Sequence, residues 1–348
     1  MEFTMSGQLE VRVSPADVGK RVSLRSLTDP GADGARLTDT VGVLTSWTDG
    51  VLCVTRRNGA AVRVPQERLV AGKVVPPAPA RRRDLPAAGY AELTRVAARG
   101  WPAVESEPLG GWTLRASGGF TRRANSVLVL GDPGLPLDAA LEHVAAWYAR
   151  RGLPAYVQVG TGAEGADEVL AAALAERGWT REASADVRVA GLAPALDAAE
   201  DPPGAAPGGA GHPVEVRLAR APDAAWLGRY QRLGRAAPEA VRVLGGGPSV
   251  WFATVPGGSG DAGPAAAIGR CVVDGRWAGF TAVEVAPQRR RTGLARAVLA
   301  ALARRALAEG ASAAYLQVER DNAAALGLYE RLGFAPHHSY HHHRAPRG

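Results

Sequence analysis

The fold of this chain is decided by one stretch near its C-terminal end, Val285-Ala-Pro-Gln-Arg-Arg-Arg-Thr-Gly-Leu-Ala295. The residues before it, 277–285, are apolar and β-prone, which predicts a strand that stops at Pro287. A helix is predicted to begin near Gly293, because apolar residues then recur every four positions, at Leu294, Val298, Leu302 and Ala306. The stretch is therefore a strand that runs through a basic turn into a helix.

This basic turn has the features of a phosphate-binding site. The first amides of a helix have no partner within the helix, and together with the helix dipole they attract an anion. Gly293 has no Cβ, so the backbone can approach that anion closely. Arg289, Arg290 and Arg291 add guanidinium groups that can hold phosphate oxygens in a bidentate fork. The alternative is a solvated arginine run on an ordinary strand-to-helix turn, and the turn alone does not decide between the two.

A second motif follows the helix. Residues 313–319 alternate as a strand, and Asn322 to Phe334 then reads NAAALGLYERLGF. With both motifs in order, the chain resembles the GNAT superfamily of acetyl-CoA-dependent N-acetyltransferases. Arg290 to Ala295 is similar to its pyrophosphate loop, Arg/Gln-x-x-Gly-x-Gly/Ala, and Asn322 to Phe334 is similar to its Asn-x-x-Ala…Tyr…Gly-Phe segment. The resemblance is tightest over residues 277–335 and extends over 212–345.

The resemblance implies an α/β (α+β) GNAT fold, a mixed central sheet with flanking helices, with acetyl-CoA as co-substrate. It implies that the loop holds the cofactor pyrophosphate through Arg290, Arg291, Thr292, Gly293, Leu294 and Ala295. It further implies that Val283 and Val285 pair with the pantetheine arm, that Asn322 contacts the same arm, and that Tyr329 protonates the leaving thiolate.

Two of these residues also have structural interpretations. Asn322 stands directly before a helical segment, where it would serve as an N-cap without any ligand. Tyr329 would be a core aromatic, because Leu326 and Leu332 lie at compatible spacing on the same helix. Asn322 could fill both roles, and the sequence leaves both interpretations of Tyr329 open.

Acetyl transfer to an amine requires a base. An amine with a pKa of about 10 is almost wholly protonated at neutral pH. Some family members that act on protein N-termini carry Glu where this chain has Gln317, and Gln cannot accept the proton. Glu284 and Glu319 are the remaining candidates, and Glu319 lies two residues beyond Gln317, on the same face of a strand. The alternatives are a bound water as the base, or solvated and salt-bridged roles for both carboxylates.

Composition is typical of a soluble, cytoplasmic enzyme. The chain has 348 residues, of which 46% are hydrophobic, enough for two or three domains. No apolar run approaches the ~18–20 residues that span a bilayer, and the start lacks a signal-peptide pattern, so no membrane partner is expected. Cys53 and Cys271 are the only cysteines and are interpreted as packing residues. The net charge of +7 comes almost entirely from arginine in an Ala/Gly/Pro-rich chain, which indicates a high-GC coding sequence and makes nucleic acid an unlikely partner.

The N-terminal residues 11–75 predict a small all-β unit. Five short strands are expected, and two hairpins are predicted to close through type I′ turns at Asp49-Gly50 and Asn58-Gly59. This pattern is typical of an SH3-like barrel, which would serve docking or dimerisation, or bind peptide or nucleic acid together with Arg81 to Arg83. Residues 76–89 are expected to be a Pro/Arg-rich linker.

Residues 90–190 repeat the order strand, helix, strand, helix, Gly-aromatic, strand that is found from residue 277 onward. We interpret them as a second, degenerate GNAT-like unit in tandem with the catalytic unit at 212–345. Its loop, Gly131 to Leu137, carries an acidic residue and prolines where amides and arginines are needed, so we expect no pyrophosphate there. For Thr121 to Ser126 an ordinary hairpin turn is favoured over a role in lining a substrate cleft. Residues 191–211 are expected to be a partly disordered linker.

The tail, Pro336 to Arg344, holds five of the seven histidines. A last strand, structural or lining the substrate cleft, is favoured over a metal site, because only alternate histidines of a strand could converge. No metal is therefore expected.

Together these features predict an N-acetyltransferase in which an amine attacks the thioester of acetyl-CoA directly, without an acyl-enzyme. The alternative is a non-catalytic module that binds acetyl-CoA as a signal or docks a partner. The amine, on a small molecule or a protein, is not fixed by the sequence, nor are the length of the acyl group and the oligomeric state, for which a homodimer is one option.

Overall fold

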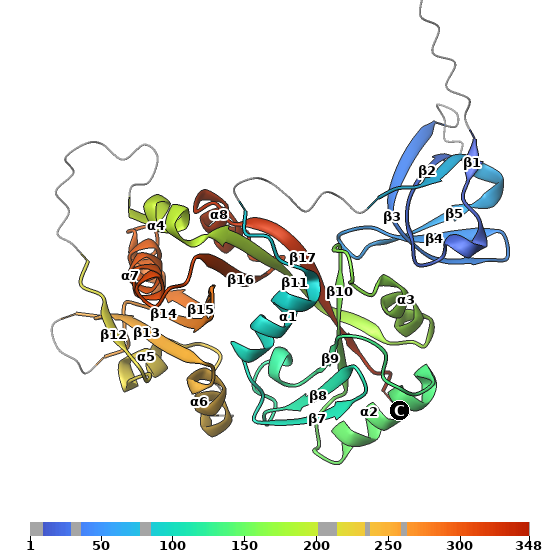
Figure 1. Ribbon diagram of the computed structural model, residues 1–348. Coiled ribbons are helices and arrows are strands. Elements are labelled where there is room, and N and C mark those ends of the chain that lie inside the picture. The colour runs from blue at the N-terminus through green and yellow to red at the C-terminus, as the bar shows by residue number, and fades with distance from the viewer. Residues whose placement is uncertain are drawn as a thin grey trace, which may run out of the picture.

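The computed structural model describes residues 10–28, 36–76, 85–200, 214–233, 237–258 and 263–347. Two sheets organise these residues, a six-stranded sheet at the N-terminal end and an eleven-stranded sheet built by the rest of the chain (Figure 1). The linker expected at 76–89 falls largely on residues 77–84, which include Arg81 to Arg83 and lie outside the described part of the chain.

The small sheet forms the N-terminal domain. Its strands are β1 (Val11–Arg12), β2 (Arg21–Leu27), β3 (Leu37–Thr48), β4 (Val51–Thr55), β5 (Ala61–Pro65) and β6 (Leu69–Val74). They lie in the order β1-β6-β2-β3-β4-β5 around a buried core that includes Leu24, Leu44 and Leu52. Within the described residues no strand pairing joins β5 back to β1. A closed SH3-like barrel therefore stays a prediction.

The two predicted hairpin turns differ. At Asp49-Gly50 both residues have positive φ, 52° and 70°, as a type I′ turn requires. At Asn58-Gly59 only Gly59 does, with φ 75°, and the backbone N–H of Arg56 donates to the carbonyl oxygen of Ala60 at 2.8 Å. The type I′ turn predicted there is wrong, because the loop is longer and a single left-handed glycine closes it.

The large sheet is built from two halves of the chain with the same order of elements. The first half contributes α1 (Tyr90–Arg99), β7 (Glu105–Leu109), β8 (Trp112–Ala116), β9 (Val127–Val129), α2 (Leu137–Ala149), β10 (Tyr156–Thr161), α3 (Glu168–Glu176) and β11 (Thr180–Gly191). The second contributes β12 (Arg217–Ala219), α5 (Ala224–Arg229), α6 (Ala237–Gly245), β13 (Ser249–Val255), β14 (Ala267–Asp274), β15 (Trp277–Val285), α7 (Leu294–Ala308), β16 (Ala313–Glu319), α8 (Ala323–Arg331) and β17 (Ala335–Arg344). The tandem repeat predicted from the sequence is present.

The two units exchange their last strands. The sheet order is β12-β13-β14-β15-β16-β11-β17-β10-β9-β8-β7, so β11 of the first unit pairs with β16 of the second, and β17 pairs with β10. Both exchanged strands also pair antiparallel with each other at the centre of the sheet. The units are thus joined by backbone hydrogen bonds into one continuous sheet.

Two buried arginines occupy matching places in the two units. Arg115 on β8 donates from Nη2 to Ser126 Oγ at 2.9 Å, and Arg270 on β14 donates from Nη1 to Thr281 Oγ1 at 3.2 Å. Burial lowers the pKa of each guanidinium to about 10. Each arginine ties its strand to the next one through a hydroxyl, which marks the repeat at the level of single side chains.

Helices cover both faces of the large sheet. On one face α7, α8 and a further helix, α4 (Leu192–Glu200), pack on the second unit, while α2 and α3 pack on the first. On the other face α1 lies over the central strands, where Leu93 and Val96 contact Val187 and Tyr315 (Figure 1). The carboxylates and polar side chains considered below lie on the α1 face.

The linker expected at 191–211 is partly helical. Helix α4 spans Leu192–Glu200, and Leu192, Ala195 and Ala199 are buried in the core that α7 also covers. The expectation was wrong for these residues, because Pro194 stands in the first turn of the helix, where a missing backbone N–H costs little. Residues 201–211 lie outside the described part of the chain.

Candidate active site

The basic turn between β15 and α7 is held in a left-handed conformation at two positions. Gly293 caps α7 with φ 85°, and Arg291 has φ 66°. Between them, Thr292 Oγ1 donates to the carbonyl oxygen of Arg289 at 2.6 Å. A left-handed residue other than glycine costs roughly 1–2 kcal/mol, and such strain is concentrated at functional sites. The turn of the second unit therefore has a specific, strained backbone conformation.

Unpaired donors surround this turn. The first hydrogen bond within α7 runs from the amide of Ala297 to the carbonyl of Gly293, which leaves the amides of residues 294–296 without a helical acceptor. The side chains of Arg289, Arg290 and Arg291 are exposed, and within the described residues their guanidinium groups have no recorded ion pair or hydrogen bond. No acidic residue stands in the first turn of α7. This donor set fits a diphosphate.

The corresponding loop of the first unit differs as expected. Asp132 Oδ1 accepts a hydrogen bond from the amide of Gly134 at 2.6 Å, so the loop satisfies its own donor. Helix α2 follows Pro136, which has no amide hydrogen, and carries Asp138 in its first turn, paired with Arg177. A second anion would meet negative charge here, which supports the prediction that only the C-terminal unit binds the pyrophosphate.

Strands β15 and β16 diverge next to the turn. They pair in parallel only where Trp277–Phe280 lies opposite Ala313–Leu316. A bulge then shifts the register of β14 with β15, and Ala282 within it has φ 52°. Val283 lies in the bulge and Val285 beyond it, where the described strand pairings leave the edge of β15 toward β16 without a partner. That edge is where a pantetheine arm is predicted to pair.

Asn322 and Tyr329 lie on α8. Asn322 Oδ1 accepts a hydrogen bond from the amide of Ala325 at 3.1 Å, so its N-cap role is confirmed, while a contact with the cofactor stays a prediction. The Tyr329 ring is buried in the core with Leu294 and packs edge-on against Phe334, 5.9 Å between centroids. Burial raises the pKa of Tyr329 to about 12. The ring is therefore a core aromatic, and its role as an acid stays a prediction.

The two candidate bases are brought together by the segment after α5. Glu284 is half-buried on β15, and its Oε2 accepts a hydrogen bond from the amide of Gln231 at 3.1 Å. The next residue, Arg232, donates from Nη2 to Glu319 Oε1 at 2.9 Å. Burial raises the pKa of Glu284. Glu319 is thus salt-bridged, as its structural interpretation predicted, whereas the recorded partner of Glu284 is a backbone amide.

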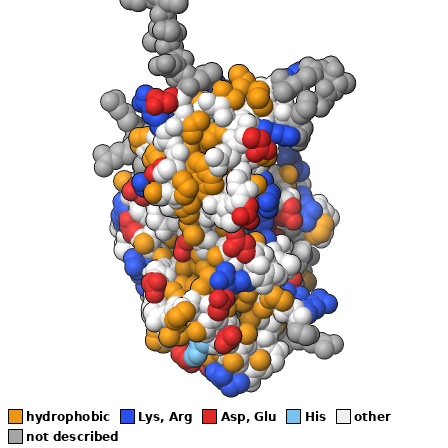
Figure 2. Space-filling model, turned by 90° about the vertical axis from the view of Figure 1, so that its right-hand side faces the viewer, with side chains coloured by type: hydrophobic (Ala, Val, Ile, Leu, Met, Phe, Trp, Pro, Cys, Tyr) orange, Lys and Arg blue, Asp and Glu red, His pale blue; other side chains and the backbone are white. Residues whose placement is uncertain are grey.

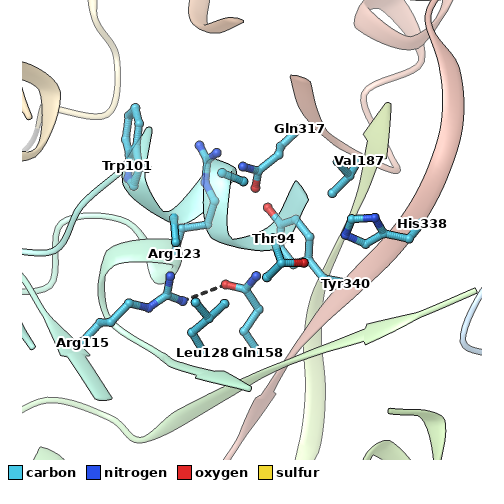
Figure 3. Close-up of a pocket in the computed structure, with 12 residues that line it drawn as sticks. Thr94, Trp101, Arg115, Arg123, Leu128, Gln158, Val187, Gln317, His338 and Tyr340 are labelled. Carbon is cyan, nitrogen blue, oxygen red and sulfur yellow. Dashed lines mark hydrogen bonds between the residues drawn. The ribbon is translucent and has the colours of Figure 1, made fainter. Parts of the chain in front are cut away.

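A cavity of about 380 Å³ opens beside Glu319, between the two units. Arg232 and Glu319 come from the second unit, Arg122 and Arg123 from the first, and Tyr340 and His342 from the exchanged strand β17. A smaller cavity of about 20 Å³, room for one water, adjoins it. Arg123, Gln317 and Tyr340 converge on this second cavity in Figure 3. Gln317 and Glu319 therefore lie on one face, as their spacing predicted.

Some residues that line this cavity were not predicted from the sequence. Residues Thr121 to Arg123 line it from a 3-10 turn (Arg122–Ala124), so the cleft interpretation of that basic cluster describes it better than a simple hairpin turn does. His342 and Tyr340 carry no motif of their own. The one available signal was the alternation of the tail, which put every second residue on the same face.

The histidine-rich tail forms β17, as predicted, at the centre of the large sheet. Burial lowers the pKa of His338 and of His341 to about 3 and that of His343 to about 4, so these imidazoles are neutral. His341 bridges Thr161 Oγ1 and Ser184 Oγ, at 2.9 and 2.7 Å. Across the described ranges no group of three or more His, Cys, Asp or Glu is placed to hold a metal ion.

Two observations concern other partners. In the part of the chain that the structure describes, no helix is both long and apolar enough to cross a membrane. On the face shown in Figure 2, Lys and Arg side chains are interspersed with Asp and Glu. That face therefore presents no continuous basic patch to nucleic acid.

Comparison with known proteins gives the family of the chain. Residues 90–343 match the family described as "Probable histone acetyltransferase Rv0428c C-terminal". The chain is similar to the probable histone acetyltransferase Rv0428c of Mycobacterium tuberculosis (strain ATCC 25618 / H37Rv), 29% identical over 337 residues, 94% of this chain and 95% of that protein. It is also similar to the uncharacterized N-acetyltransferase YobR of Bacillus subtilis (strain 168), 26% identical over 262 residues, 74% of this chain and 98% of that protein.

A solved structure is similar as well. A GCN5-related N-acetyltransferase from Kribbella flavida is 17% identical, with a TM-score of 0.48, and the match covers 75% of this chain and 98% of that one.

Proposed function

The chain belongs to the probable histone acetyltransferase Rv0428c C-terminal family, and from this membership and the site we propose that it moves an acetyl group from acetyl-CoA to an amine by direct attack on the thioester. It is a GNAT-family N-acetyltransferase. The proposal concerns which residues hold the donor, which one removes the proton of the amine, and which one returns a proton to the thiolate.

The donor is held by the second unit. The amides of Leu294 and Ala295 and the side chains of Arg290 and Arg291 bind the pyrophosphate, and Gly293 lets the backbone approach it. The open edge of β15 at Val283 and Val285 holds the pantetheine arm through backbone hydrogen bonds. Acetyl-CoA supplies the acetyl group in an activated form, as a thioester.

Glu284 acts as the base. Its raised pKa makes it a better proton acceptor near neutral pH than an ordinary carboxylate, whereas the Glu319 carboxylate is engaged by the guanidinium of Arg232. As the amine nitrogen forms its bond to the carbonyl carbon and the carbon–sulfur bond breaks, the amine proton passes to Glu284. Tyr329 gives its hydroxyl proton to the leaving sulfur.

The cysteines support direct attack. Cys271 is buried in the core, and burial raises the pKa of its thiol to about 12, so it is not a thiolate at neutral pH. Cys53 lies on β4 of the N-terminal domain. Neither is suited to form an acyl-enzyme.

One observation carries the proposal: a left-handed Gly293 opens α7 beside three guanidinium groups that have no recorded partner among the residues that the structure describes. Calorimetry with acetyl-CoA, followed by thiol release over a panel of amines, tests it. We expect micromolar binding and turnover of at least one amine. Tight binding without turnover of any amine would favour the binding-module alternative, and no binding would exclude the assignment of the loop.

A further inference from the structure

The 380 Å³ pocket is lined by more positively charged than negatively charged side chains. Its recorded ion pairs are Arg232 with Glu319 at 2.9 Å, and Arg122 with Glu182 at 3.3 Å. His342 also lines the pocket, and its buried Nε2 has no hydrogen-bond partner within the described ranges. Among the described residues, Arg123 is the charged side chain of this pocket that has no ion-pair partner.

Arg123 is a half-buried guanidinium without a counter-ion. Among the described residues it has no ion pair and no recorded hydrogen bond, and its Nη1 is buried and unpartnered. Its Cζ lies over the Trp101 ring, 4.7 Å from the centroid, in a cation–π contact. Removing a charge from water without a partner is costly, so an anion bound beside Arg123 would be stabilised by it.

The pocket places Arg123 and Glu319 on walls that come from different units. Arg123 belongs to the first unit, while Glu319 and Arg232 belong to the second. Glu284 is not among the residues that line the pocket, but its Oε2 accepts a hydrogen bond from the amide of Gln231, the residue before Arg232. The cavity volume is at the lower end of the range for small-molecule sites. A ligand that spans it has one end at the guanidinium and the other near the Glu319 carboxylate.

We propose that this pocket binds an acceptor that carries an anionic group, a carboxylate or a phosphate, a few atoms from its reacting amine. The anionic group is bound by Arg123 of the degenerate unit, and the amine faces Glu319 of the catalytic unit, on the side of the pocket where Arg232 follows Gln231, whose amide binds Glu284. This assignment rests on the proposed acetyl transfer and narrows its acceptor to small anionic amines. It also gives the degenerate unit a role, the recognition of the acceptor.

The test compares matched amines. β-Alanine is paired with propylamine and phosphoethanolamine with ethanolamine, and a neutral peptide with one lysine is a further acceptor. The enzyme should prefer the anionic member of a pair through a lower KM. Arg123→Met should raise that KM by about 10- to 100-fold, because a hydrogen-bonded charge is lost, and should change kcat and the neutral amines little. Arg123→Lys should restore part of the loss.

Arg122→Met is the matched control. Arg122 lies on the same wall but is already paired with Glu182, so its loss should change KM by less than about 5-fold. Equal use of both members of each pair, or a preference that survives in Arg123→Met, would overturn the proposal. Preference for the lysine peptide over every small amine would do the same and would indicate a protein acceptor.

A binding measurement separates this inference from the proposed reaction. Protein saturated with coenzyme A, which covers the basic turn at 289–295, is titrated with glutarate and with inorganic phosphate. Wild-type protein should bind at least one of them, and the identity of that anion distinguishes carboxylate from phosphate recognition, while Arg123→Met should bind neither. Lack of anion binding by the wild type overturns the inference, whereas anion binding without thiol release from any amine contradicts only the proposed reaction.

Discussion

Val187 of the first unit lies directly opposite Gln317 of the second in the antiparallel pair of β11 and β16. On the far side of β11, Val187 also lies opposite His338 on β17. Two strands from different units therefore form the floor beneath the candidate site. The acceptor pocket, the Gln317 cavity and the end of β16 all depend on a strand that the catalytic unit does not itself supply.

A fragment of residues 212–348 should consequently fail to fold as a soluble monomer. It lacks β11, which would leave the backbone donors and acceptors of β16 unpaired and exposed. Residues 76–348 keep all eleven strands and should unfold cooperatively, since among the described residues the N-terminal domain contacts them only at one edge, through β3 against α3 and through its loop at 57–59, where Arg57 Nη2 donates to the carbonyl of His337 at 3.1 Å. Gel filtration and thermal unfolding monitored by circular dichroism check both fragments. A monomeric, cooperatively folded 212–348 fragment would contradict the role given to the exchanged strand.

Gly293→Val should weaken acetyl-CoA binding by about 10-fold or more, because a β-branched residue is strained at φ 85° and the turn must rearrange. Calorimetry with acetyl-CoA measures the loss. Gly310→Val is the matched control, since Gly310 has φ 90°, nothing within 4 Å of an added Cβ, and lies beyond the other end of α7. Both variants should lose a similar free energy of unfolding, but the control should keep its affinity. Equal affinity in both would mean that the turn does not bind the donor.

The sequence predicted what depends on local pattern. The strands at 277–285 and 313–319 were predicted with their observed bounds, because alternation and apolar runs are local signals. The strand exchange was not predicted. The sequence pattern of β11 and of β17 would be the same whether each strand paired within its own unit or with the other unit. Arg270 was missed for a related reason. Arginine is usually exposed, and only the fold brings the carbonyls of Leu244, Gly100 and Gly246 to its guanidinium.

The same distinction applies to the candidate site: the part formed by consecutive residues could be predicted, and the part formed by residues far apart in the sequence could not. The pyrophosphate turn could be predicted because its amides, glycine and arginines are consecutive in the chain. Arg123 and Glu319 could not be linked, since almost two hundred residues separate them and the pocket that joins them exists only after both units assemble. Trp101, which contacts Arg123, lies on the loop after α1 and carries no signal of its own.

Tyr329→Phe should lower kcat by about 10- to 100-fold and leave the affinity for acetyl-CoA nearly unchanged, because a proton donor is lost while the buried ring stays. With a pKa raised to about 12, the hydroxyl keeps its proton over the whole working pH range. Steady-state kinetics and calorimetry check the two halves of the prediction. Tyr315→Phe is the control, since that hydroxyl is buried on the α1 face, 3.5 Å from the carbonyl of Val96. Full activity of Tyr329→Phe would exclude the tyrosine as the acid.

Glu284→Gln should remove the acid limb of the pH profile. The base works only when deprotonated, so kcat/KM rises as pH increases through the pKa of Glu284, and burial shifts that rise from the ordinary carboxyl range toward neutral pH. Loss of the base should lower kcat by about 10²-fold or more. Glu319→Gln breaks the ion pair with Arg232 and should reduce activity less while keeping the limb, because Glu284 is still present. Profiles of kcat/KM against pH for both variants decide the assignment: a limb that disappears only in Glu319→Gln would transfer the role of base to Glu319.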